Sequence, residues 1–275
     1  MIIIDTHHHF WRYDPVEYDW ITDDMARIRK DFLPEQLREV IEKAGVNAVI
    51  SVQARQMISE TEWLLDMADK NDFIRGVVGW LPLVELSVES YLEKYSDNPY
   101  LKALRHVLQG ENDEYMLTGE FNYGIGLLRK YNLVYDVLVF ESQLPAAIDM
   151  VDHHPYQVFV LNHIGKPRIK ENIILPWAEN IRKLAERPNV YCKISGMVTE
   201  AGFHNWHREQ LIPYMDVVMD AFGSERLMFG SDWPVCLVSC KYEGWLNLVK
   251  DWLEQFPINE QAMILGGNAV RVYRL

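Results

Sequence analysis

The stretch Ile2-Ile3-Ile4-Asp5-Thr6-His7-His8-His9 decides between two α/β folds, because a β-rich run ends here in polar side chains. An open, doubly wound sheet normally carries a glycine-rich phosphate loop directly after its first strand. The segment Asp5–His9 contains no glycine. The end of the first strand therefore favours a closed barrel.

The rest of the chain alternates β-rich segments with segments of helical periodicity. The predicted strands are Ile2–Thr6, Ala48–Gln53, Ile74–Leu81, Leu101–Val107, Leu133–Phe140, Gln157–His163, Val190–Ser195 and Leu227–Ser231. The predicted helices include Pro34–Ala44, a helix from a capping box at Ser59 through Asp69, Pro176–Arg187, His207–Phe222, and a last helix from Asn259 toward Tyr273. About 250 residues is the usual length of a (β/α)8 barrel. We therefore expect an α/β fold in which residues 1–275 form a single (β/α)8 TIM barrel domain.

The composition limits the class of protein and its partners. Hydrophobic residues make up 49% of the 275 residues, enough to bury a full core. With 27 basic and 40 acidic residues the net charge is −13, which argues against binding to nucleic acid or to an anionic membrane surface. No apolar stretch approaches the roughly 20 residues of a membrane span. Three cysteines cannot all pair with one another, so we expect a cytoplasmic protein with a small-molecule or protein partner. The oligomeric state is left open.

The histidines that follow the first strand are the first candidate site. Residues two apart on a strand face the same way, so Asp5, His7 and His9 share a face. Two imidazoles at this spacing can bind one divalent metal ion or the oxygens of one substrate. Active sites of (β/α)8 barrels lie at the carboxyl ends of the strands, which favours a functional site over a chance histidine cluster.

A second candidate is Asp232, within Phe229-Gly230-Ser231-Asp232-Trp233-Pro234. It follows the last predicted strand, where a carboxylate can bind a metal ion or take a proton from water. In isolation, an Asp-Trp-Pro sequence would indicate only a turn. The first and eighth strands of a closed barrel are neighbours, however, so we expect His7, His9 and Asp232 to converge.

Two further strands carry polar residues inside apolar runs. His163 ends one such run, where it suits proton transfer, a hydrogen bond to a substrate oxygen, or only the capping of a turn. Arg105 and His106 interrupt Leu104–Gln109, and burying a charge there is costly without a purpose. Arg105 can orient an anionic or carbonyl oxygen, and a structural ion pair is the alternative.

Other candidates rest on weaker signals. Tryptophans near the expected mouth of the barrel can pack against a sugar ring, although most tryptophans pack in cores. The residues predicted to bind substrate are Trp11, His106, Lys193, Trp206 and Trp233. A structural zinc site at Cys236 and Cys240 is not expected, because no second pair of ligands lies nearby. The chain has no glycine-rich phosphate loop and no Gly-x-Ser-x-Gly nucleophile turn.

Five motifs, in this order, resemble the amidohydrolase superfamily in its branch of small "amidohydrolase 2" proteins. They are Asp5–Trp11, Leu104–Gln109, His163–Pro167, Cys192–Ala201 and Phe229–Cys236. The resemblance runs from residue 2 to about residue 273, and within the branch the chain looks most like sugar lactonases that act on L-fuconolactone or L-rhamnonolactone. The motifs are specific for the branch and much less specific for the substrate.

The resemblance implies a metal site as well as a fold. His7, His9 and Asp232 match the family's metal ligands, and one divalent ion, zinc first, is expected there. Metal-rich members carry a lysine or histidine after the fourth or fifth strand, whereas 131–140 offers only Asp136. A binuclear site is therefore not expected, and some lactonases of this branch work without any metal.

The resemblance also implies a hydrolase that opens an aldonolactone to the sugar acid. Water would attack the ring carbonyl while Asp232 accepts its proton. Arg105, His7 and His9, or a metal ion that the histidines hold, would stabilise the developing oxyanion. His163 would fix a substrate oxygen or protonate the departing ring alkoxide, and both roles stay open.

Two other functions remain as alternatives. A metal-dependent decarboxylase or amide hydrolase on the same scaffold predicts tightly bound zinc and loss of activity with a chelator. A non-catalytic binding barrel predicts unchanged function after Asp232→Asn. For the lactonase we expect a neutral substrate, because Arg105 is the one clear cation among the candidates, unless Lys166 and Lys193 both point inward.

Overall fold

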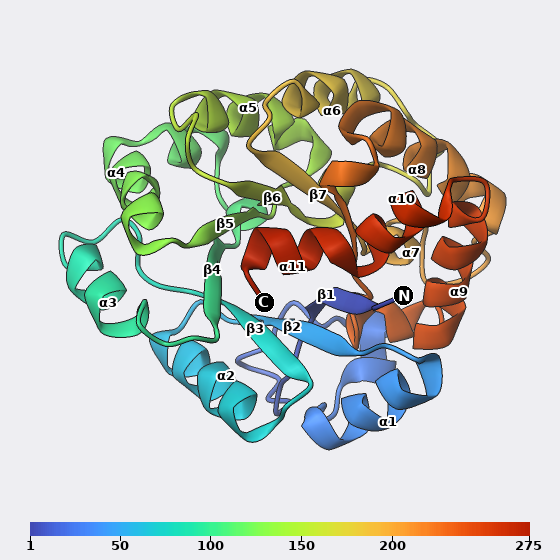
Figure 1. Cartoon of the computed structure of the whole chain (residues 1–275), viewed down its shortest axis with the longest axis horizontal. Coiled ribbons are helices and arrows are strands. Elements are labelled where there is room, and N and C mark those ends of the chain that lie inside the picture. The colour runs from blue at the N-terminus through green and yellow to red at the C-terminus, as the bar shows by residue number, and fades with distance from the viewer.

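Eight parallel strands form a barrel with helices around it (Figure 1). The computed structural model describes residues 1–275. The strands pair in chain order, and β8 returns to β1 through a bridge between His8 and Trp233. Their bounds are β1 Ile4–His8, β2 Ala48–Val52, β3 Ile74–Gly79, β4 Leu101–His106, β5 Val134–Val137, β6 Phe159–Leu161, β7 Val190–Ile194 and β8 Leu227–Phe229. The predicted (β/α)8 barrel is confirmed.

The observed strands match all eight predicted ones, but most end earlier than predicted. The fifth prediction ran to Phe140, for example, whereas β5 ends at Val137. The eighth ran to Ser231, whereas β8 ends at Phe229. The chain leaves the sheet at these points, so the polar residues that follow the strands stand at the rim of the barrel.

Most helices surround the strands, and α11 lies across one end of the barrel (Figure 1). Their bounds are α1 Pro34–Ala44, α2 Ile58–Lys70, α3 Val88–Tyr95, α4 Gly119–Leu128, α5 Leu144–Asp152, α6 Trp177–Ala185, α7 Met197–Glu200, α8 Arg208–Phe222, α9 Tyr242–Leu253, α10 Ile258–Ala262 and α11 Asn268–Tyr273. The bounds predicted for α1 are confirmed at both ends. None of the helices combines the length and the apolar character that crossing a membrane requires.

Two predicted helix caps are wrong. Ser59 lies inside α2, because the Glu60 side chain accepts from the backbone N–H groups of Ala54 and Arg55 in the preceding turn and the helix starts before Ser59. Asn259 lies inside α10, which follows Pro257. The last predicted helix is also divided, because a π-helical turn at 263–267 separates α10 from α11.

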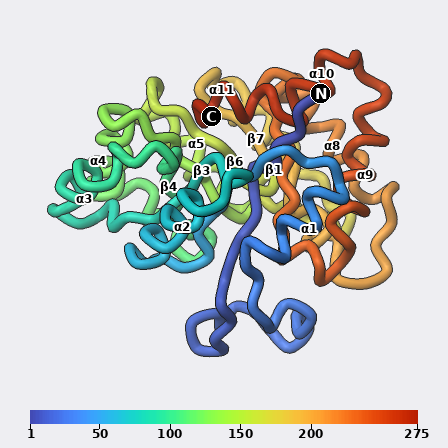
Figure 2. The backbone as a smooth tube through the Cα atoms, turned by 60° about the horizontal axis from the view of Figure 1, so that its bottom comes forward, coloured from blue at the N-terminus to red at the C-terminus, as the bar shows by residue number.

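The two ends of the barrel differ in what covers them. Helix α11 lies across the amino-terminal end of the strands, near both chain termini (Figure 1). There Val272 packs with the inward-facing Ile50, Val78 and Val160. The segment 9–33, between β1 and α1, projects from the opposite end (Figure 2). An apolar floor therefore closes one end, and the candidate site residues occupy the other.

Candidate active site

Three imidazoles surround one carboxylate at the carboxyl ends of the strands. The Nε2 atoms of His7 and His9, on and just after β1, lie 3.8 and 3.5 Å from Asp232 Oδ1. His163, which follows β6, places its Nε2 atom 3.8 Å from the same oxygen. All four side chains are buried. The structure thus brings together the three residues expected to converge and adds His163 to them.

Two glycines, which have no Cβ atom, leave room for the side chains of His7 and His163. A Cβ atom on Gly230 would lie 2.8 Å from the His7 Cβ, and one on Gly196 would lie 2.5 Å from the His163 Nδ1. His163 and Asp232 themselves have left-handed backbones, with φ of 53° and 58°. Such conformations cost non-glycine residues about 1–3 kcal/mol and cluster at functional sites.

Hydrogen bonds at the far side of two rings set their orientation. His9 Nδ1 lies 2.8 Å from the Val52 carbonyl oxygen, which can only accept, so this nitrogen carries the proton. In neutral His9 the Nε2 lone pair therefore faces the Asp232 carboxylate. Two acceptors 3.5 Å apart need a shared proton or a cation between them. His163 Nδ1 pairs with Ser195 Oγ at 2.9 Å. This arrangement of imidazole nitrogen and carboxylate oxygen atoms suits the binding of a divalent metal ion.

One group of possible metal ligands in the structure contains a residue that was not predicted as a ligand. Ligand atoms of His7, His163 and Asp232 all lie within 4.8 Å of one another. The sequence places His9 in this set, whereas the structure groups His163 with the other two. His7 Nδ1 is buried without a hydrogen-bond partner.

The nearby Arg105 adds a positive charge to the site. Its Nη1 lies 3.3 Å from His7 Nε2 and donates to Asn162 Oδ1 at 3.2 Å, while Nη2 donates to Gln53 Oε1 at 2.9 Å. Burial lowers the pKa of Arg105 to about 10, so the guanidinium is still charged at neutral pH. A charge this close to the imidazoles opposes the binding of a cation, and we expect the metal to bind weakly.

Burial and neighbouring groups also determine the charges of the two histidines His7 and His163 and of Asp232. Burial lowers the pKa of His7 well below its ordinary value and that of His163 to about 3. Burial opposes ionisation of Asp232, but its interactions with the neighbouring His163 and His9 outweigh this effect and lower the pKa of the carboxyl. The site therefore presents an ionised carboxylate at neutral pH.

We expect at most one metal ion per chain, because the structure offers a single cluster of ligands. Atomic absorption on protein purified without added metal measures the content. His163→Ala should lower the amount of zinc retained after dialysis, whereas the exposed His204, changed to Ala, should not. Two equivalents of zinc per chain would contradict the single site.

A cavity of about 360 Å³ opens above these residues, a volume suited to a small ligand. Its polar lining includes His9, Arg105, Gln109, His163, Lys166 and Asp232. Its apolar lining includes Trp20, Met25, Leu138, Phe203 and Val235. Trp20, Gln109 and Phe203 were not among the predicted residues.

The three tryptophans predicted to bind substrate do not line this cavity. Trp11 is fully buried, and its Nε1 donates to the Lys30 carbonyl. Trp206 points its Nε1 at the Ser239 carbonyl. Trp233 is buried on the far side of the strand end. Trp11 and Trp233 belong to the buried core and Trp206 packs against it, whereas Trp20 from the projecting segment lines the cavity.

His106 and Lys193 also lie outside the cavity. Because side chains alternate along a strand, His106 points away from the side that Arg105 faces, and its Nε2 pairs with Glu111 at 2.9 Å. Lys193 is fully buried in the barrel, where its Nζ lies 2.5 Å from Asp136. We therefore assign substrate binding to neither. Because Asp136 is paired with Lys193, it is not available as a ligand for a second metal ion.

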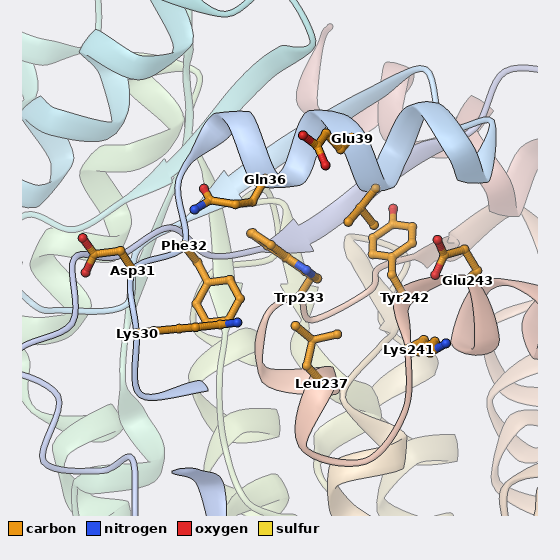
Figure 3. Close-up of a pocket in the computed structure, with 11 residues that line it drawn as sticks. Lys30, Asp31, Phe32, Gln36, Glu39, Trp233, Leu237, Lys241, Tyr242 and Glu243 are labelled. Atoms are coloured by element: carbon orange, nitrogen blue, oxygen red, sulfur yellow. The ribbon is translucent and has the colours of Figure 1, made fainter. Parts of the chain in front are cut away.

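A second cavity, of about 400 Å³, lies outside the barrel between α1 and α9 (Figure 3). Figure 3 shows Phe32, Trp233 and Tyr242 lining it, with Lys241 and Glu243 near its edge. It is slightly larger than the cavity above Asp232, but neither the imidazoles nor Asp232 line it. The chemistry therefore belongs to the smaller cavity at the strand ends.

A (β/α)8 barrel with an ionised aspartate among imidazoles at its strand ends belongs to the class of barrel hydrolases that activate water with a carboxylate or a bound metal. The family model described as Amidohydrolase matches residues 4–275. The chain belongs to this amidohydrolase family.

Individual relatives cover nearly the whole chain. An L-fucono-1,5-lactonase from Burkholderia multivorans is 37% identical over 99% of this chain and 96% of its own length. An L-fucono-1,5-lactonase from Burkholderia ambifaria is 31% identical over 99% of this chain and 95% of its own length. A crystal structure of a Burkholderia multivorans amidohydrolase with bound zinc has a TM-score of 0.97 at 37% identity, with 100% of both chains covered.

Proposed function

We propose that this protein hydrolyses a neutral sugar lactone, with L-fucono-1,5-lactone as the first candidate and L-rhamnonolactone as the second. The observation that carries the proposal is the Asp232 carboxyl group held among three imidazoles at a cavity of about 360 Å³. The names of the two lactonase relatives support the choice of substrate. The product is the open-chain sugar acid.

Asp232 acts as the general base in the proposed reaction. Its carboxylate is ionised at neutral pH and lines the cavity, so it can take a proton from a water that attacks the lactone carbonyl. Arg105 lines the same cavity and donates toward the oxygen on which negative charge develops. In the metal-free site, His163 holds a substrate oxygen beside Asp232. A divalent ion, which His7, His163 and Asp232 would hold, supplies Lewis-acid polarisation of the carbonyl when bound.

The charges in the cavity support a neutral substrate. Lys166 lines it, but its Nζ lies 3.4 Å from Glu200, so the pair carries no net charge. Lys193 is tied to Asp136 and does not reach the cavity. Arg105 is then the one cation without a carboxylate partner, and it is needed for the developing oxyanion.

Acid release from a panel of lactones tests the proposal directly. The panel contains L-fucono-1,5-lactone, L-rhamnonolactone, and phosphorylated and dicarboxylated lactones of similar size, each with and without chelator. We expect the neutral sugar lactones to give the highest kcat/KM. A tenfold preference for the anionic lactones, about 1.4 kcal/mol of transition-state binding, would contradict the assignment. Activity confined to amides or aryl acids would favour the amide hydrolase or decarboxylase instead.

Trp20 is expected to form the aromatic face for the sugar. Trp20 is 39% exposed and lines the cavity, so a bound lactone can cover its ring. Trp20→Ala should lower kcat/KM about tenfold, mainly through KM, as expected for the loss of about 1.4 kcal/mol of binding. Trp206→Ala serves as the control, because Trp206 lies outside the cavity and should leave both constants near wild type. Equal effects of the two substitutions would contradict this role.

We also infer that residues 1–275 form one domain and that the protein works in the cytoplasm. The return of β8 to β1 supports the first statement. The second is supported by Cys192, Cys236 and Cys240, which are all free thiols.

A further inference from the structure

The turn that follows β6 has an unusual backbone. His163, Ile164, Gly165 and Lys166 have φ values of 53°, 48°, 72° and 46°, so four successive residues lie in the left-handed region. Only glycine adopts this region without penalty. The turn is held by the Trp177 Nε1, which donates to the Ile164 carbonyl at 2.8 Å, and by the Lys166 N–H, which donates to the His163 carbonyl at 2.9 Å.

This turn places Lys166 in the same cavity as the imidazole of His163. His163 and Ile164 do not have right-handed helical dihedral angles, so the segment is an irregular turn. His163 and Lys166 are three apart, and both line the cavity above Asp232. A lysine that served only to form a surface ion pair would not require an unfavourable backbone. Strain of this kind is retained where a side chain must be held at a functional site.

Glu200, on α7, holds the lysine at the cavity. Its Oε1 lies 3.4 Å from the Lys166 Nζ, and the two side chains are 23% and 18% exposed. The Lys166 Nζ also lies 5.3 Å from the centre of the Phe140 ring. Lys166 is the one lysine that lines this cavity. The Lys166 ammonium group is therefore held by Glu200 and the Phe140 ring, and the side chain is still partly exposed.

We propose that Lys166 is a catalytic residue that protonates the ring oxygen of the lactone as this oxygen leaves. The inference rests on the proposed lactonase function. Water adds to the carbonyl carbon and gives one proton to Asp232, which forms the tetrahedral oxyanion. The bond from the carbonyl carbon to the ring oxygen then breaks, and the ring oxygen keeps the electron pair and takes a proton from the Lys166 Nζ.

The protons balance over the cycle. The products are a carboxylic acid and a free hydroxyl group, and the amine of Lys166 regains a proton from solvent as Asp232 loses the one it accepted. The departing group in a sugar lactone is an alkoxide, a poor leaving group, so a proton donor at the ring oxygen has a large effect on this step. Glu200 is a positioning residue, because it acts by holding the ammonium group.

Leaving-group dependence separates this role from substrate binding. We compare kcat/KM for L-fucono-1,5-lactone with that for dihydrocoumarin, whose leaving group is a phenolate with a conjugate-acid pKa of about 10. Lys166→Met should lower kcat/KM on the sugar lactone by about 10²–10⁴-fold, but on dihydrocoumarin by less than about fivefold, as Brønsted behaviour requires. Lys170→Met, which changes an exposed lysine four residues further on, should leave both substrates unaffected.

Each outcome decides the proposal. Lys166→Asn removes the ammonium group but suits the left-handed backbone, so it should reproduce the Lys166→Met result even if methionine disturbs the turn. An equal loss on both substrates in both variants, or no loss on the sugar lactone, would overturn the acid role of Lys166. The proposed function is tested separately, because it fails only if the wild-type protein does not open the sugar lactone.

Discussion

Asp232→Asn is expected to lower turnover of the sugar lactone by about 10²–10⁴-fold, because only a carboxylate can accept the proton of the attacking water. The fold should be retained. Asp232 has a left-handed backbone, with φ of 58°, and asparagine tolerates this conformation better than most residues. The new amide group can also donate to the His9 Nε2 lone pair, 3.5 Å from the present Oδ1. Initial rates of acid release, together with thermal unfolding, measure both effects.

Asp216→Asn is the matched control. Asp216 lies on α8 and accepts from the Trp252 Nε1 at 2.9 Å, far from the cavity. It should keep wild-type turnover. If Asp232→Asn is folded and retains near-normal turnover, Asp232 is not the base. A non-catalytic binding barrel would then be the better description.

The barrel and the position of the site were predictable because they follow from short, local patterns. The β-rich runs mark the strands, and the period of two along a strand puts His7 and His9 on one face. In a closed barrel the first and last strands are neighbours, and this brings Asp232 to the same place as His9. The two residues are 223 positions apart in the sequence. Each of these steps needs only the identity of neighbouring residues and the general geometry of the fold.

The lining of the cavity was not predictable from such patterns. Trp20 reaches it from segment 9–33, which has no strand or helix period that would indicate where a side chain points. Lys166 reaches it through a left-handed turn that contains Ile164, a β-branched residue that disfavours this conformation. Trp11 and Trp233 lie beyond the last residues of β1 and β8, where strand alternation no longer indicates which way a side chain points, so they could not be told apart from residues that face the site.

Contacts between distant strands were equally impossible to predict from local sequence patterns. Asp136 on β5 binds Lys193 on β7, and it also accepts from the Tyr273 hydroxyl on α11 at 2.8 Å and from Asn162 Nδ2 at 2.9 Å. No local pattern links these positions. Asn162 also accepts from Arg105, so the C-terminal helix is connected to the active site through buried polar groups.

Lys193→Met should therefore destabilise the protein and leave substrate binding unchanged. The substitution leaves the Asp136 carboxylate buried without its counter-charge, which costs about 3–5 kcal/mol in comparable buried pairs. Urea denaturation at neutral pH measures the loss in the free energy of unfolding. KM for the lactone, measured on the folded fraction, should stay within about twofold of wild type, because Lys193 does not line the cavity.

The double variant Asp136→Asn with Lys193→Met separates charge from packing. The asparagine oxygen can still accept from Tyr273, and residue 136 no longer carries an unpaired charge, so most of the lost stability should return. If the double variant is as unstable as Lys193→Met alone, the loss comes from packing of the lysine stem and not from the unpaired carboxylate. A stable Lys193→Met protein with a strongly raised KM would restore Lys193 to the substrate-binding residues, because an ion pair that served only the fold could not produce that result.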